Sequence, residues 1–305
     1  MKQQVQAGEQ AKKVDQEVCQ GLVFGIVGLG LMGGSYAKAL RRLGARKIIG
    51  LDRDKAICRA AQQEGLVDFT CDEQNEALRE VNVLICAVYP SSLLGFVQRN
   101  VSYLHPQVLL TDVLGIKGDL PAKIAGLLGP QMAFVAGHPL AGKEGQGLAQ
   151  ADADIFVGAN YLVMTGAHNR ATKVEWLKNF ALALGCKQVV EMTPAEHDAL
   201  IAYTSNLPHV LALALLNSTS FGEQTKDLVG GSFRDATRVA TINAELWSEL
   251  LLANRRNVQK EISNLQAELA KWSEALLRQD QGQVEAMMKT AAARRRDLTD
   301  GNNNC

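Results

Sequence analysis

The stretch Val23–Asp52, VFGIVGLGLMGGSYAKALRRLGARKIIGLD, carries the strongest fold signal in the chain. Its first residues, 23–27, are apolar and predict a short buried strand. Three glycines follow at the spacing G-x-G-x-x-G, namely Gly28, Gly30 and Gly33. This spacing permits a tight turn, a close approach of the backbone to a phosphate, and close packing of the following helix on the strand.

The second half of the same stretch completes a strand–turn–helix–strand unit. Apolar residues at helical spacing over 35–43 predict a helix that stops at Gly44, and residues 47–51 predict a second strand that ends at Asp52. An open helix N-terminus offers unpaired N–H groups to phosphate oxygens. The unit therefore predicts a dinucleotide site, and Asp52 is placed to accept hydrogen bonds from the adenosine ribose.

The acid also bears on which dinucleotide is bound. A carboxylate at Asp52 favours NAD, because it would repel the 2′-phosphate of NADP, although the neighbouring Arg53 could accommodate that phosphate. Residues at the ends of two later strands should complete the cofactor site. The predicted cofactor-binding residues are Gly28, Leu29, Gly30, Leu31, Met32, Gly33, Asp52, Arg53, Val88, Tyr89 and Asp112.

Composition narrows the class of protein. The 305 residues contain 32 Lys plus Arg and 32 Asp plus Glu, and this balance suggests neither nucleic acid nor an anionic membrane as a partner. The six cysteines are scattered, without a metal-binding cluster, which is typical of a reducing compartment. The first twenty residues are too polar for a signal peptide. We expect a cytoplasmic protein with no bound metal and no membrane-spanning segment.

The order of elements predicts two domains. Strands alternate with helices as far as Met192, which predicts a Rossmann-type, doubly wound parallel sheet. After Pro194 only helical patterns appear, and the first of them, at 195–221, is interrupted by Pro208. Their apolar content suggests a homodimer interface, with a self-contained helical domain as the alternative. The predicted divisions are a flexible tail at 1–20, an NAD-binding domain at 21–193, a helical substrate and dimerisation domain at 194–290, and a disordered tail at 291–305.

Several residues have the chemistry of a catalytic site. His138 lies in a predicted loop after a strand at 133–136, where a histidine could exchange a proton near neutral pH. His197 and His209 are separated by nearly a whole number of helical turns. Arg234 and Arg238 are one turn apart and could bind carboxylates, or could instead form ordinary ion pairs.

Seven blocks of sequence together resemble the prephenate and arogenate dehydrogenase family. They are GLGLMGGS, TDVLGIKG, GHPLAGKEGQG, ADADIFVGANYLV, EHDALIAYTSNLPH, GGSFRDATRVA and NAELW. The resemblance covers roughly residues 22–255. It implies a dinucleotide domain, a helical dimerisation domain, and the NAD-dependent oxidative decarboxylation of prephenate to 4-hydroxyphenylpyruvate.

The resemblance also implies roles for individual residues. His138 matches the histidine that hydrogen-bonds the substrate hydroxyl, His209 a second active-site histidine, and Arg238 the arginine that holds a carboxylate. Trp247 matches a tryptophan that can reach the partner subunit's site, or it is an ordinary core residue. Arg234 is the remaining candidate for substrate binding. Two departures affect the hydrogen-bond network: Gly115 stands where the family often has serine, and Asn206 where many members have histidine.

Other functions stay open at this level. Arogenate dehydrogenase shares the chemistry, and no residue decides between the two substrates. A dehydrogenase of the 3-hydroxyacid type would need a catalytic lysine early in the helical domain, and residues 195–221 contain none. A non-catalytic NAD-sensing protein has the missing serine as its support. Too few residues follow the last helices for a regulatory domain, so we expect a monofunctional enzyme.

Overall fold

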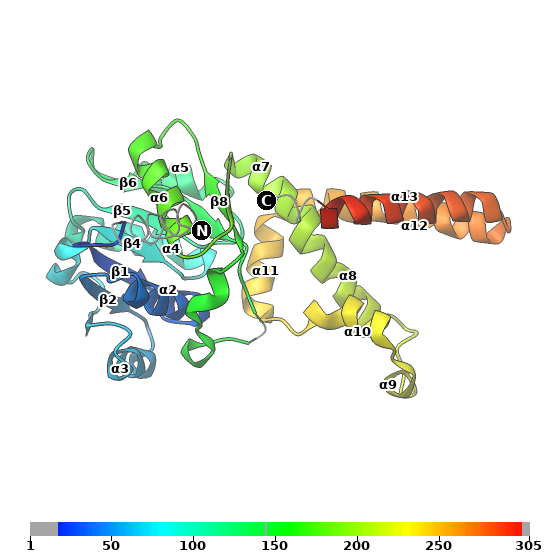
Figure 1. Cartoon of the computed structure of the whole chain (residues 1–305), viewed down its shortest axis with the longest axis horizontal. Coiled ribbons are helices and arrows are strands. Elements are labelled where there is room, and N and C mark those ends of the chain that lie inside the picture. Colours follow the sequence, from blue (N-terminus) through cyan, green and yellow to red (C-terminus); the bar gives the residue numbers. More distant parts are fainter. Residues whose placement is uncertain (1–17, 144, 301–305) are drawn as a thin grey trace, which may run out of the picture. The chain divides into compact units, whose positions relative to one another are not determined.

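The computed structural model describes residues 18–143 and 145–300 (Figure 1). The chain forms two compact units, one ending at Asn254 and the other beginning at Arg255. The predicted tail at 1–20 lies outside the described residues except for a turn at 18–20, where Cys19 is buried. All of the candidate site residues belong to the first unit.

Six parallel strands form the central sheet of the first unit. They are β1 (Val23–Val27), β2 (Lys47–Leu51), β3 (Phe69–Thr70), β4 (Val83–Cys86), β5 (Leu109–Asp112) and β6 (Ala133–Phe134). Their order is β3-β2-β1-β4-β5-β6, so the chain reverses its direction of travel across the sheet between β1 and β4. The predicted Rossmann-type, doubly wound sheet is confirmed, and ligands of such sheets bind at this switch point.

Alternating residues of the strands enter two hydrophobic cores on opposite faces of the sheet. In β1, Phe24 and Ile26 belong to one core, while Val23 and Val27 belong to the other. This alternation follows from the two-residue repeat of a strand. The helices of this region are α2 (Leu31–Arg42), α3 (Lys55–Gln63), α4 (Pro90–Asn100), α5 (Leu120–Ala125) and α6 (Ala171–Ala183). Short 3-10 turns lie at Glu76–Glu80, Val101–Tyr103, Leu148–Gln150 and Ala153–Phe156.

A second, three-stranded sheet follows the first. It consists of β7 (Gly137–Pro139), β8 (Asn160–Met164) and β9 (Gln188–Met192), with β7 antiparallel to β8 and β8 parallel to β9. His138 therefore lies on a strand and pairs with Leu162, and its predicted position in a loop is wrong. Sequence periodicity missed β7 because it is only three residues long.

The helical part begins with a continuous run that the sequence predicted to be interrupted at Pro208. Helix α7 (Pro194–Ile201) passes through a π-helical turn (Ala202–Asn206) into α8 (Leu207–Leu216). Pro208 sits in the first turn of α8, where its missing N–H disrupts little because the π turn has already rearranged the bonding. Thr193 and Glu196 form a capping box that starts α7.

The run Pro194–Leu216 is long and apolar enough to cross a membrane by length and composition, with 28% of that window buried. The expectation that no segment meets this criterion is therefore wrong. One such helix is weak evidence for a membrane protein. This one carries the buried polar pair His197 and Asp198, whose hydrogen bonds to the cofactor-binding part of the chain fit a helix of a folded domain.

The remaining helices of the first unit are α9 (Thr225–Leu228), α10 (Gly231–Thr237), a 3-10 turn (Arg238–Ala240) and α11 (Ala244–Ala253). The second unit is an α-helical hairpin of α12 (Arg255–Leu277) and α13 (Gln281–Asp300). The predicted disorder from residue 291 is wrong as far as Asp300, because α13 continues to that residue. Residues 301–305 lie outside the described part of the chain.

Candidate active site

The glycine turn has the shape that a dinucleotide requires. Gly28 has a positive φ of 86°, and a Cβ there would lie 2.3 Å from the Ala87 carbonyl oxygen. A Cβ on Gly33 would lie 1.8 Å from the Gly28 carbonyl oxygen, whereas a Cβ on Gly30 would meet no atom within 4 Å. Gly28 and Gly33 are thus required by the fold, and Gly30 borders open space at the start of α2.

The N-terminus of α2 is available to a negatively charged group. The cap residue Gly30 provides no side-chain bond, and the first turn contains no acidic residue. Helix α2 therefore presents its first backbone N–H groups and the positive end of its dipole toward the glycine turn. Arginines at the other end, Arg41 and Arg42, complement the dipole.

The Asp52 side chain accepts two backbone hydrogen bonds. One carboxylate oxygen accepts a hydrogen bond from Leu29 N at 2.8 Å, and the other accepts from Asp54 N at 2.9 Å. Asp52 therefore joins the glycine turn to the end of β2, and each oxygen keeps a second lone pair for a ribose hydroxyl. Arg53 is exposed beside it.

The carboxyl ends of the central strands meet in register. Val27 pairs with Cys86, and Cys86 pairs with Asp112, so the loops after β1, β4 and β5 leave the same edge. Val88 lies in the loop after β4, and a Cβ on Gly28 would be 3.2 Å from its side chain. Val88 therefore borders the glycine turn. A role of Val88 and Tyr89 in cofactor binding stays a prediction.

Helix α11 docks on this edge of the sheet. Asn243 Nδ2 donates to Tyr89 Oη at 2.9 Å, and Glu249 accepts hydrogen bonds from Ser91 N at 3.1 Å and Ser91 Oγ at 2.9 Å. The Ser91 N–H belongs to the first turn of α4, where a carboxylate is favourable. These contacts hold α11 against the loop after β4 and the first turn of α4.

A chain of three polar side chains forms the centre of the candidate active site. His138 Nδ1 lies 2.9 Å from His197 Nε2, and His197 Nδ1 lies 2.7 Å from Asp198 Oδ1. His138 is half-buried on β7, while His197 and Asp198 are buried at the start of α7. The helical spacing of His197 and His209 did not indicate this contact, in which His197 bonds to His138 on another element.

The hydrogen bonds determine which nitrogen of His138 is free. The Asp198 carboxylate can only accept, so His197 Nδ1 carries a proton and donates. A neutral His197 then accepts at Nε2, and His138 must donate from Nδ1. The remaining nitrogen, His138 Nε2, holds a lone pair, which is the state that a general base needs.

Burial and nearby charge favour the neutral form of both histidines. Burial lowers the pKa of His138 well below its usual value, and the nearby Lys117 cation and His197 lower it further. Burial also lowers the pKa of His197, against the opposing effect of its bond to Asp198. Burial acts to raise the pKa of Asp198, but hydrogen bonds from His197 and from the Gly118 and Lys117 amides outweigh it, and the pKa is lowered.

His138 Nε2 faces a space beside Gly115. A Cβ on Gly115 would lie 3.8 Å from His138 Nε2 and 3.8 Å from Leu250 Cδ2, which is ordinary van der Waals contact. The loop after β5 therefore forms one wall of this space, and Leu250 of α11 forms another. A substrate group placed here would approach the lone pair of His138 directly.

The other candidates gather around α8. The rings of His209 and Trp247 stack with a centroid distance of 3.7 Å, so Trp247 packs on a histidine of its own chain. His209 Nδ1 donates to Ser205 O at 2.8 Å, which leaves Nε2 as an acceptor. Burial lowers the pKa of His209, and Arg238 contributes to that lowering, which places the guanidinium nearby. Arg234 is exposed on α10.

Two residues of the site, Asp198 and Lys117, were missed from the sequence, and His197 was considered without its bond to His138. All three lie in blocks that the resemblance includes, yet the bonds that bring them together cross 59 to 81 positions of the chain. Asp112 was expected to contact the cofactor, but its carboxylate is 1% exposed and is used by Lys117 and by the Gly137 amide. A buried lysine close to two histidines is a signal that appears only once the fold is known.

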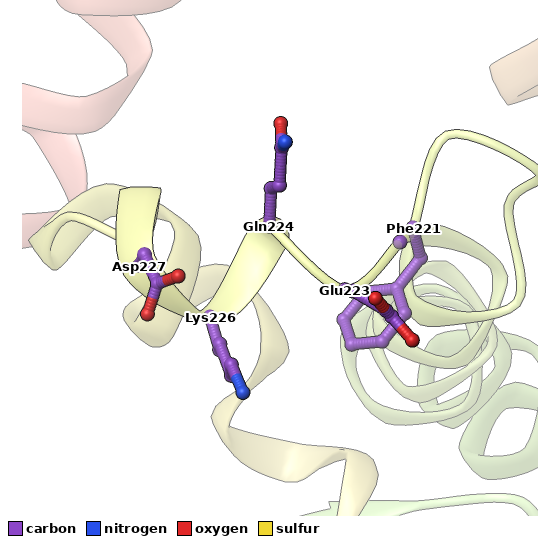
Figure 2. A pocket seen from close by; sticks show the side chains of 6 residues that line it. Phe221, Glu223, Gln224, Lys226 and Asp227 are labelled. Atoms are coloured by element: carbon purple, nitrogen blue, oxygen red, sulfur yellow. The ribbon is translucent and has the colours of Figure 1, made fainter.

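A surface depression of about 750 Å³ lies elsewhere, around the loop before α9. It is lined by Phe221, Gly222, Glu223, Gln224, Lys226 and Asp227. Figure 2 shows that Gln224 and Lys226 point in opposite directions, so the polar groups do not converge on one point. The depression therefore lacks the features of a catalytic site.

Known protein families account for this arrangement. The family profile described as prephenate dehydrogenase, nucleotide-binding domain, matches residues 36–190. The profile described as prephenate dehydrogenase, dimerization domain, matches residues 193–290. The chain belongs to the prephenate dehydrogenase family. Together the two profiles cover both the sheet region with His138 and the helical region with His197, His209 and Arg238.

Relatives cover most of the chain. A prephenate dehydrogenase of Bacillus subtilis is 30% identical over 282 residues, covering 90% of this chain and 75% of its own. A cyclohexadienyl dehydrogenase of Zymomonas mobilis is 29% identical over 263 residues, covering 84% and 88%. Family membership therefore rests on whole-length similarity and does not depend on the glycine motif.

Solved structures of the family have the same fold. Prephenate dehydrogenase from A. aeolicus in complex with hydroxyphenyl propionate and NAD+ aligns with a TM-score of 0.81 and 27% identity, covering 90% of this chain and 98% of that one. Arogenate dehydrogenase from Synechocystis aligns with a TM-score of 0.78 and 26% identity, covering 91% and 100%. These similarities span both the parallel sheet and the helical region.

Proposed function

We propose that this protein is an NAD-dependent prephenate dehydrogenase, which converts prephenate and NAD to 4-hydroxyphenylpyruvate, carbon dioxide and NADH. The observation that carries the proposal is the hydrogen-bonded chain Asp198–His197–His138, which leaves the lone pair of His138 Nε2 facing the space beside Gly115. Membership in the family supports the choice of reaction.

The glycine turn fits NAD. The pyrophosphate would lie at the N-terminus of α2, close to Gly30, Leu31 and Met32, where nothing would meet a Cβ on Gly30 within 4 Å. Asp52 would bind the adenosine ribose through its free lone pairs. When bound, NAD supplies the hydride acceptor. The N–H groups of α2 and the carboxylate of Asp52 would hold it at the edge of the sheet where the loop after β5 leads to Gly115.

His138 performs the proton chemistry. Prephenate carries a hydroxyl on the ring carbon that gives up a hydride, and this hydroxyl becomes a carbonyl as the hydride leaves. His138 Nε2 accepts the hydroxyl proton as this happens, while its Nδ1–H remains bonded to His197 Nε2. The Asp198 carboxylate stabilises the positive charge that develops along the two rings. Loss of carbon dioxide then makes the ring aromatic and moves an electron pair onto the carbonyl oxygen, which takes the proton back from His138 Nε2.

The carboxylates of prephenate need cationic or donor groups. We assign one of them to Arg238, whose guanidinium lies near His209, with Arg234 as a second candidate one helical turn away. His209 and Trp247, whose rings stack on each other, would form the wall that contacts the substrate ring. Burial disfavours a charge on His209, so this histidine serves as a neutral hydrogen-bonding group.

We also propose that the protein works as a cytoplasmic homodimer through its helical region, with a cofactor domain at 21–193 and a helical domain at 194–290. The helix run α7–α8 exposes large apolar side chains, including Leu200 at 53% and Tyr203 at 63%. A second copy of the chain would remove this surface from water. The matching profile is described as a dimerization domain. A monomeric mass by light scattering at micromolar concentration would contradict the dimer.

The decisive experiment is to follow NADH or NADPH formation with four pairs: prephenate or arogenate, each with NAD or NADP. We expect turnover of prephenate with NAD to exceed that of the other pairs. Preference for arogenate would keep the base and the fold and would place the difference in the pocket for the substrate side chain. NAD binding without turnover of either substrate would contradict the proposal and favour a sensor.

A further inference from the structure

Lys117 is the most unusual charged residue in the described part of the chain, because its ammonium group is completely buried. Its side chain is 0% exposed, and it lies in the loop between β5 and α5. The Nζ atom is 2.6 Å from Asp112 Oδ2 and 2.7 Å from the Gly137 carbonyl oxygen. An ammonium group is rarely buried unless it is paired, so these two bonds are a structural requirement.

The ion pair holds both backbone groups of Gly137. Lys117 donates to the Gly137 carbonyl, and Asp112 Oδ1 accepts from the Gly137 N–H at 3.0 Å. Gly137 immediately precedes His138, at the point where the chain passes from the first sheet to the second. The Lys117–Asp112 pair therefore fixes the peptide from which His138 projects.

The backbone of the same lysine holds the other end of the chain of polar groups. The Lys117 N–H donates to Asp198 Oδ1 at 3.0 Å, and the Gly118 N–H donates to Asp198 Oδ2 at 2.7 Å. Lys117 thus contacts Asp198 through its main chain and Gly137 through its side chain. A single residue of the loop after β5 connects the two ends of the histidine pair.

A buried ion pair is a poor way to stabilise a protein. Replacing such a pair by apolar side chains of similar size is often neutral or stabilising, because removing two charges from water is costly. The presence of the buried Lys117–Asp112 pair at the end of β5 is therefore better explained by its effect on neighbouring groups. The neighbours in question are the two histidines, since Lys117 lowers the pKa of both His138 and His197.

The charged and titratable groups around His138 come from three elements. Lys117 and Asp112 approach from the loop after β5 and from β5 itself, and His197 approaches from α7 with Asp198 behind it. Asp198 favours protonation of His197, whereas Lys117 opposes protonation of both rings. Among the residues just named, Lys117 is the one that carries a positive charge near both rings.

We propose that Lys117 is a positioning residue that aligns His138 with His197 and Asp198 and whose charge keeps His138 available as a base in mildly acidic solution. The proposal rests on the proposed function, because it assigns Lys117 to the same reaction. The chemistry is unchanged by it: no proton passes through Lys117, whose ammonium group donates to Asp112 and to the Gly137 carbonyl throughout.

Two variants remove the positive charge of Lys117 and differ in what they leave around it. Lys117→Gln keeps a donor for Asp112 and Gly137, and Lys117→Met with Asp112→Asn removes both charges of the pair. We expect both proteins to lose activity at acid pH more than at alkaline pH. A His138 that is easier to protonate moves the acid limb of the kcat/KM profile upward by about one pH unit, equal to about a tenfold loss at the acid end.

The matched control is Lys123→Met on α5. Lys123 pairs with Asp119 on the surface, and its side chain is 55% exposed. This variant should keep the wild-type profile. An acid limb that stays in place in a folded Lys117 variant would overturn the proposal. A loss by the same factor at every pH would overturn the role given to the Lys117 charge, because lost alignment or lost packing alone gives that result.

A measurement without substrate separates this proposal from the proposed function. The imidazole Cε1–H signals of the five histidines can be followed by NMR during a pH titration of the NAD-bound protein, with His138→Asn assigning one signal. We expect the His138 signal to titrate at higher pH in both Lys117 variants than in the wild type. If the wild-type protein does not turn over prephenate, the proposed function fails, while this titration still tests Lys117.

Discussion

The cofactor turn and the histidine chain are built in opposite ways. The cofactor turn lies within Val23–Asp52, and its longest side-chain bond, from Leu29 N to Asp52, spans 23 positions. The histidine chain joins β5, β7 and α7, with bonds that span 25, 59 and 81 positions. The bond that closes the cofactor turn joins residues of one strand–helix–strand segment, whereas the catalytic groups come together only when distant segments of the chain have folded.

The largest expected effect breaks the histidine chain and spares the turn. His138→Asn removes the base, and we expect kcat to fall by about a hundred- to ten-thousandfold. The dissociation constant of NAD, measured by calorimetry, should stay within about threefold of the wild type. The matched control is His168→Asn, which changes an exposed histidine of the same unit. Activity of His138→Asn close to that of the wild type would mean that another group is the base.

The turn can be broken in the same way. Gly33→Ala places a Cβ 1.8 Å from the Gly28 carbonyl oxygen, so the turn must open. We expect a loss of about 1–3 kcal/mol in the free energy of unfolding together with weaker NAD binding. Gly30→Ala meets no protein atom within 4 Å and should fold normally but bind NAD less well. Urea unfolding measures the stability of both variants, and calorimetry measures their NAD binding. Equal losses of stability in Gly33→Ala and Gly30→Ala would contradict this prediction.

The pH dependence of stability should come from the histidine chain. The pKa values of His138 and His197 are lower in the folded protein than the usual 6.5, so below about pH 6.5 the unfolded chain binds more protons. The free energy of unfolding should therefore decrease as the pH falls from 6.5, by up to about 1.4 kcal/mol per pH unit for each histidine. Urea unfolding at fixed protein concentration measures this, and His138→Asn should reduce the slope.

Cofactor preference tests the turn at its acidic end. Asp52→Asn removes the charge that repels a 2′-phosphate and leaves Arg53 to bind it. We expect kcat/KM with NAD to fall by about tenfold and kcat/KM with NADP to rise. Arg53→Gln in the same background is the control and should reverse the gain with NADP. An unchanged ratio of the two cofactors would place the selectivity elsewhere.

The smallest expected effect comes from Gly115, which lies beside His138 of the histidine chain and Leu250 of α11. Gly115→Ser adds a side chain at van der Waals distance from His138 Nε2 and Leu250, so the fold can accept it. We expect kcat to change by less than about threefold, because the bond from His138 Nδ1 to His197 already orients the base without a hydroxyl at position 115. Steady-state rates with prephenate and NAD test this. A gain of tenfold or more would show that a hydroxyl at this position is needed to orient the substrate.

The sequence predicted the elements around the cofactor turn better than those around the histidine chain. The strand β2 was predicted at its observed bounds, and α2 begins four residues earlier than its apolar pattern suggested, because Leu31 and the glycines that follow it are already helical. By contrast, β7 was taken for a loop, and the π turn that carries the helix past Pro208 was read as an interruption. Short elements that depend on distant partners leave no periodic pattern.

The sequence by itself determined the parallel sheet, the dinucleotide turn and the identity of His138 as the candidate base. These features depend on apolar periodicity, glycine spacing and short motifs, all of which act over a few residues. Only the tertiary structure decided that Asp198, His197 and His138 form one chain and that Lys117 joins its two ends. Burial and the approach of distant segments create those bonds, and neither property belongs to any single stretch of the chain.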